Sequence, residues 1–122
     1  AVDKAVSAFI EDIESRGLSE KVLLVITGEF GRTPKINAKG GRDHWGNLCP
    51  LVFVGGGLKM GQVIGESDKK GAEPITNPIT SNDLLGTIMH SLFDLGQVRT
   101  LANIPRDVQD VVGSGNPISE LI

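Results

Sequence analysis

The sequence predicts an α/β fold with a mainly parallel sheet flanked by helices. Two continuous apolar runs rich in β-branched residues, 22–26 and 51–54, have the pattern of strands buried on both faces. Two other segments carry apolar residues at three-and-four spacing, as amphipathic helices do. Helix, strand, long loop, strand, loop and helix follow one another along the chain, which is the order expected of an α/β domain.

The first helix is predicted over residues 2–16. Its acidic and lysine side chains lie off the apolar stripe, and Gly17 is expected to cap its C-terminal end. The stripe consists of Val2, Ala5, Val6, Phe9, Ile10 and Ile13.

The second helix is predicted to begin at a capping box. Thr80 and Asp83 have the spacing of that motif, an apolar stripe follows, and Gly96 is expected to close the helix. Residues 58–79, which precede it, are rich in glycine and proline and read as a loop with one short hairpin around residues 62–64.

The last part of the chain is polar and weakly periodic. One short helix is predicted at residues 106–112. Ser114, which stands between two glycines, is interpreted as a turn residue.

Length and composition restrict the class of protein. The chain has 122 residues, and we expect residues 1–122 to form a single domain. A net charge of −3 lacks the basic excess of a nucleic-acid binder, and no apolar run approaches the roughly 20 residues of a membrane-spanning helix. The single cysteine, Cys49, excludes an internal disulfide and is expected to be a small buried residue at the start of the second strand.

The residues capable of chemistry concentrate in residues 28–47, GEFGRTPKINAKGGRDHWGN. The segment leaves the carboxyl end of the first predicted strand, the edge of a parallel sheet where ligands gather. Glu29 could reach a metal ion or a substrate over that edge. From position alone, a helix cap or a surface acid is an equal alternative.

Two arginines in this segment suit an anion. Arg32 and Arg42 have planar guanidinium groups that form paired, charge-assisted hydrogen bonds to phosphate or sulfate. The alternative is a salt bridge to Glu29 or Asp43, and this alternative applies more to Arg42 than to Arg32.

Three adjacent residues add ligand chemistry. Asp43 and His44 place a hard oxygen ligand beside an imidazole, a pair suited to zinc, manganese or another divalent ion. Trp45 is expected to pack as a structural lid more than to stack on a sugar.

Elsewhere, His90 is interpreted as a helix histidine, and no phosphate-binding loop, dinucleotide motif or nucleophile elbow occurs.

Four stretches carry a resemblance to a known family: VLLVITGEFGRTP, GRDHWGN, PLVFVGGGLKMGQVIGESD and ITSNDLLGTIMHSLFDLG. Together they resemble the C-terminal part of the bacterial sulfatase-like family called domain of unknown function fifteen-hundred-and-one, within the alkaline phosphatase superfamily. The resemblance covers essentially the whole chain and implies an alkaline-phosphatase-like C-terminal fold. It also implies a fragment of a longer protein, whose N-terminal portion supplies the nucleophile and completes the site.

The resemblance implies a metal ligand at Glu29, in the place where the superfamily has a metal-binding acid. Phe30 departs from the pattern, because it stands where the superfamily has His or Asn and a phenyl ring cannot ligate a cation. Asp43 and His44 are therefore expected to supply the missing ligand.

The activity implied is hydrolysis of a sulfate or phosphate ester, with a zinc, calcium or manganese ion as cofactor. Arg32 would be catalytic on the anion side, with Arg42 and Trp45 also contacting a small-molecule or saccharide ester. The isolated chain is expected to turn over neither ester, and the resemblance suggests a periplasmic or secreted location. One alternative is a non-catalytic surface or carbohydrate-binding relative on the same scaffold; another is a structural knot of arginine–carboxylate pairs.

Overall fold

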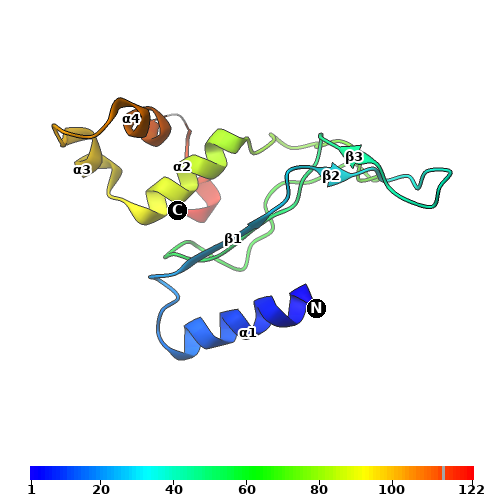
Figure 1. Ribbon diagram of the computed structural model, residues 1–122, viewed down its shortest axis with the longest axis horizontal. Helices are drawn as coiled ribbons and strands as arrows, with labels where there is room; N and C mark the ends of the chain where they lie inside the picture. The colour runs from blue at the N-terminus through cyan, green and yellow to red at the C-terminus, as the bar shows by residue number, and fades with distance from the viewer. Residues whose placement is uncertain (114) are drawn as a thin grey trace. The chain divides into compact units, whose positions relative to one another are not determined.

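The computed structural model describes residues 1–113 and 115–122, so the turn predicted at Ser114 lies outside the described residues. Helices and strands follow in the order shown in Figure 1. The helices are α1 (Val2–Ser15), α2 (Ser81–Leu92), α3 (Leu95–Thr100) and α4 (Arg106–Gly113), and a 3-10 helix, η1, covers Ser119–Leu121. The strands are β1 (Leu23–Thr27), β2 (Gly31–Arg32), β3 (His44–Trp45) and β4 (Leu51–Gly55).

The expectation of a mainly parallel, alkaline-phosphatase-like sheet is wrong. In the described part of the chain, β1 pairs with β4 and β2 pairs with β3, giving two small antiparallel sheets. Parallel neighbours need a long crossover, usually a helix, and the described residues between β1 and β4 contain no helix. The apolar runs located the longer strands correctly but carried no information on their direction.

The longer strands are also less buried than predicted. Residues of β1 are half-buried except for the exposed Thr27, and in β4 Val52 keeps 44% of its surface exposed. A continuous apolar run therefore does not distinguish a strand buried on both faces from a half-buried one.

The chain divides into two compact units. The first contains residues 1–24, 54–62 and 79–122, and the second contains residues 25–53 and 63–78. That residues 1–122 form a single domain stays a prediction.

The end of α1 confirms the cap predicted at Gly17. Gly17 adopts a left-handed φ of 65°, its amide donates to the Glu14 carbonyl at 3.0 Å, and the Leu18 amide donates to the Ile13 carbonyl at 2.8 Å. These two hydrogen bonds are the pair that defines a Schellman motif. Glycine is suited to this position because it adopts positive φ without steric cost.

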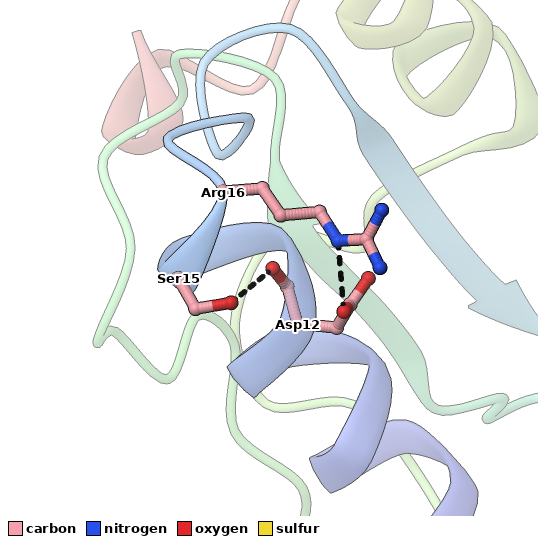
Figure 2. Close-up of polar contacts among 3 residues, drawn as sticks. All are labelled: Asp12, Ser15 and Arg16. Carbon is pink, nitrogen blue, oxygen red and sulfur yellow. Dashed lines mark hydrogen bonds and ion pairs between the residues drawn. The ribbon is translucent and has the colours of Figure 1, made fainter.

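Polar side chains tie the last turn of α1 together (Figure 2). The Ser15 hydroxyl donates to the Asp12 carbonyl at 2.8 Å, and Arg16 Nε donates to Asp12 Oδ1 at 2.9 Å. Both members of the Asp12–Arg16 ion pair are mostly exposed, so its contribution to stability is small.

The capping box of α2 is confirmed. The Thr80 hydroxyl accepts from the Asp83 amide at 3.3 Å, and Asp83 Oδ2 accepts from the Thr80 amide at 2.9 Å. The end predicted at Gly96 is wrong, because Phe93 is already extended with φ −135° and ψ 145°. Gly96 lies inside the separate helix α3, whose N-cap is Asp94.

The first unit has a small core around the C-terminal helices. Thr87 of α2 is fully buried, and its hydroxyl donates to the Asp83 carbonyl at 2.7 Å and accepts from the Ile118 amide at 2.9 Å. The short helix predicted at residues 106–112 is confirmed as α4 and packs against α2. The buried apolar side chains of this unit are Ile13, Leu58, Val112, Ile118 and Leu121.

Two local expectations in the middle of the chain are wrong. Cys49 precedes β4 as expected but is exposed, with its thiol donating to the Gly28 carbonyl at 3.3 Å. Residues 62–64 form no hairpin; the chain turns back slightly later, through an antiparallel bridge between Ser67 and Pro74.

Among the described helices, none has the length and apolar character needed to cross a membrane.

Candidate functional site

The candidate site lies in the second unit, on an antiparallel pair that we call the β2–β3 ribbon, residues 30–32 and 43–45. Gly31 pairs with Trp45, and Arg32 pairs with His44. The ribbon was not predicted, because two residues per strand are too few to show an alternating pattern. The ribbon pairs residues from the two ends of segment 28–47, in which the side chains capable of chemistry concentrate.

Glycine at position 31 allows the ribbon to pack closely. A Cβ atom added to Gly31 would lie 1.9 Å from the Leu48 carbonyl oxygen, which is backbone and cannot move aside cheaply. Glycine is therefore required by a close approach of two chain segments.

One face of the ribbon carries an arginine, an aromatic ring and an imidazole. Arg32 and His44 are cross-strand partners, so their side chains project to the same face. The Phe30 and His44 ring centroids lie 4.0 Å apart with a 32° angle between the planes. The guanidinium carbon of Arg32 lies 5.3 Å from the Phe30 ring centroid, within the range of a cation–π contact.

The positive charge on this face is not neutralised by a carboxylate. Arg32 and His44 are both exposed. Across residues 1–113 and 115–122 the one ion pair is that between Asp12 and Arg16, so Arg32 keeps its guanidinium available to a ligand.

Arg42, by contrast, hydrogen-bonds to the backbone of its own loop. Its Nη1 donates to the carbonyls of Thr33 at 2.7 Å and Pro34 at 2.6 Å. Asn37 Nδ2 donates to Asp43 Oδ1 at 2.9 Å, and the Asp43 amide donates to the Thr33 hydroxyl at 3.1 Å. The alternatives of a salt bridge from Arg42 and of an arginine–carboxylate knot are therefore wrong for this described loop, which is held by carbonyl and amide partners.

The predicted metal ligands do not form a closed set. Within the described residues, no group of three or more His, Cys, Asp or Glu side chains is placed to hold a metal ion. Glu29 is exposed, Asp43 accepts a hydrogen bond from Asn37, and the His44 ring packs on Phe30. The guanidinium of Arg32 on the same face as His44 also disfavours a second cation there.

Trp45 anchors the ribbon to a second loop. Its indole Nε1 donates to the Ala72 carbonyl at 2.6 Å, and Asn47 Nδ2 donates to Glu73 Oε1 at 2.7 Å. Trp45 is half-buried, which agrees with a structural lid, and its contact with a substrate stays a prediction.

Asp68 organises that second loop and was missed by the sequence analysis. Its Oδ1 accepts from the amides of Ala72 at 2.6 Å and Glu73 at 3.3 Å. The Ala72 hydrogen bond is the main cause of a lowered Asp68 pKa, and desolvation partly opposes it. The signal was present in the sequence, since an aspartate followed by a glycine three residues later, Gly71, is a common turn pattern.

The fold and candidate site define a chain of helices and short antiparallel strands, one ribbon of which presents exposed arginine and imidazole groups beside a half-buried aromatic ring. Over residues 1–122 the chain matches the family described as Protein of unknown function (DUF1501). The chain belongs to this family, as its sequence motifs predicted. The comparisons with curated proteins and with solved structures gave no match.

Proposed function

We propose that this chain is the C-terminal segment of a hydrolase of sulfate or phosphate esters, in which Arg32 contacts the anionic group of the ester. The observation that carries the proposal is the exposed guanidinium of Arg32, which has no carboxylate partner among the described residues and lies on a ribbon anchored through the Trp45 indole. Arginine binds tetrahedral oxyanions through two parallel hydrogen bonds, and it offsets charge that develops on the transferred group.

A zinc, calcium or manganese ion belongs to the same proposal, because such an ion activates a bound nucleophile and stabilises the leaving oxygen. The described residues do not fit a metal centre by themselves. Glu29 would therefore act as one ligand of a centre whose other donors come from the rest of the hydrolase.

Turnover of nitrophenyl phosphate and nitrophenyl sulfate by the full-length gene product tests the proposal. We expect metal-dependent hydrolysis of one ester and a loss of about 100-fold in kcat/KM for Arg32→Ala, the usual cost of removing one charge-stabilising donor. Lys39→Ala removes a charge from the same loop and should leave the rate nearly unchanged. Absence of turnover with every ion, or equal rates for the two variants, would contradict the proposal.

A non-catalytic binding function is the second candidate. It is favoured by one observation: the Phe30 ring packs on His44, and no group of three or more His, Cys, Asp or Glu side chains among the described residues is placed to hold a metal ion. Binding of calcium or a glycan without turnover of either nitrophenyl ester would favour this candidate over the hydrolase.

A further inference from the structure

We infer that Phe30 is the positioning residue of an oxyanion site, in which Arg32 and His44 form a donor pair for one small tetrahedral anion. This inference rests on the proposed function for the role of Arg32. It adds a second donor, His44, and a platform, Phe30, and it changes the expected partner of His44 from a cation to an anion.

The geometry supports a paired site. Directly opposed residues of an antiparallel pair have Cβ atoms about 4.5–5.5 Å apart, so one anion can contact both side chains. Phe30 touches both donors: its ring packs on the His44 ring at 4.0 Å and lies 5.3 Å from the Arg32 guanidinium carbon. Because these contacts already restrict both side chains, less conformational entropy is lost when the two side chains bind a ligand.

The local charge points to an anion. Residues 28–47 contain four Lys and Arg residues and two acids, a net charge of +2, whereas the whole chain carries −3. The Asp43 carboxylate accepts a hydrogen bond from Asn37, which weakens its competition for Arg32. Arg42 contributes its charge while its Nη1 bonds to backbone carbonyls, so Arg32 is the arginine of this loop presented to a ligand.

Titration of the 122-residue chain with inorganic phosphate and with sulfate tests the site. The readout is the NMR shift of the His44 imidazole at constant ionic strength, with chloride as the control salt. We expect saturable shifts with both tetrahedral anions and none with chloride. Phenyl phosphate forms a third arm: tighter binding than phosphate assigns the site to an ester, and equal binding assigns it to the free anion.

Matched variants separate a built site from diffuse charge. Arg32→Gln should weaken phosphate binding by about tenfold or more, as expected for lost charge-assisted hydrogen bonds. Lys39→Gln removes the same charge from the same loop and should change binding less than twofold. Phe30→Leu keeps apolar bulk without a ring and should weaken binding about two- to fivefold, whereas Phe30→Tyr should retain it.

Several results would overturn the inference. These are the absence of a saturable His44 shift, equal losses for Arg32→Gln and Lys39→Gln, and unchanged binding in Phe30→Leu. Saturable binding of zinc, manganese or calcium at His44 in place of phosphate would do so as well. Phosphate binding without nitrophenyl ester turnover by the full-length product would leave this inference standing while the proposed hydrolase fails.

Discussion

Phe30 and His44 lie ring against ring across the β2–β3 ribbon, with their centroids 4.0 Å apart. The sequence pattern presented Phe30 as a defect, because a phenyl ring cannot replace a metal ligand. In the folded ribbon the same ring contacts both exposed nitrogen-bearing side chains, His44 and Arg32. The ribbon must keep its close packing for these contacts to exist.

Replacing Gly31 by alanine should disrupt that packing. The new Cβ would lie 1.9 Å from the Leu48 carbonyl oxygen, so the backbone at Gly31 or at Leu48 must shift. We expect a loss of about 1–3 kcal/mol in the free energy of unfolding, typical of overpacking, and loss of the ring-current shift at His44. Gly46→Ala is the control, because a Cβ there meets nothing within 4 Å. Equal unfolding midpoints for the two variants in urea would contradict this account.

Replacing Trp45 by phenylalanine should release the second loop. The change keeps an aromatic side chain but removes the donor to the Ala72 carbonyl, at a cost of about 0.5–1.5 kcal/mol. Amide hydrogen exchange over residues 68–73 should accelerate. Asn47→Ala removes a more exposed bond to Glu73 and should have a smaller effect. Unchanged exchange in the loop of the Trp45 variant would show that the indole is not its anchor.

Acid should weaken the start of α2. The Thr80 hydroxyl, followed by the Thr80 amide, lowers the pKa of Asp83 from its ordinary value of 3.8. A carboxyl whose folded pKa lies below its unfolded pKa contributes stability above the unfolded value and loses it as pH falls through the folded value. Asp83→Asn should therefore reduce the slope of unfolding free energy against pH below about pH 5, the range where carboxyls titrate.

The Thr80→Val variant tests the same capping box from its other residue, because it removes the hydroxyl that hydrogen-bonds to the Asp83 carboxylate. Because both residues belong to one capping box, we expect the losses from Thr80→Val and Asp83→Asn to be non-additive at neutral pH. Additive losses, together with an unchanged pH slope in Asp83→Asn, would exclude the capping box as the source of the acid sensitivity.

Features decided within a few residues were predictable from the sequence. The glycine end of α1, the capping box at Thr80 and Asp83, and the position of α4 all depend on local hydrogen bonds and periodicity. The start of α3 could also have been found, since Asp94 and Gln97 have capping spacing and the Gln97 amide donates to Asp94 Oδ1 at 3.1 Å.

Features decided by distant contacts were not predictable. Strand direction depends on how the chain returns, and the apolar runs of β1 and β4 are compatible with either direction. The sequence singled out residues 28–47 as the candidate segment, but the pairing of Arg32 with His44 within it became visible only in the folded ribbon. Cys49 shows the same limit, because its burial depends on neighbours that its own sequence context does not specify.

The buried hydroxyl of Thr87 offers a test of the first unit. Thr87→Val keeps the shape of the side chain but leaves the Ile118 amide without its acceptor, at an expected cost of about 1–3 kcal/mol. Thr87→Ser keeps the hydroxyl and loses one methyl group, at about 1 kcal/mol. In urea unfolding the valine variant should therefore be the less stable of the two, and the Ile118 amide should exchange faster in it. A valine variant as stable as the serine variant would mean that packing of the methyl group, and not the hydrogen bond, holds Ile118 against α2.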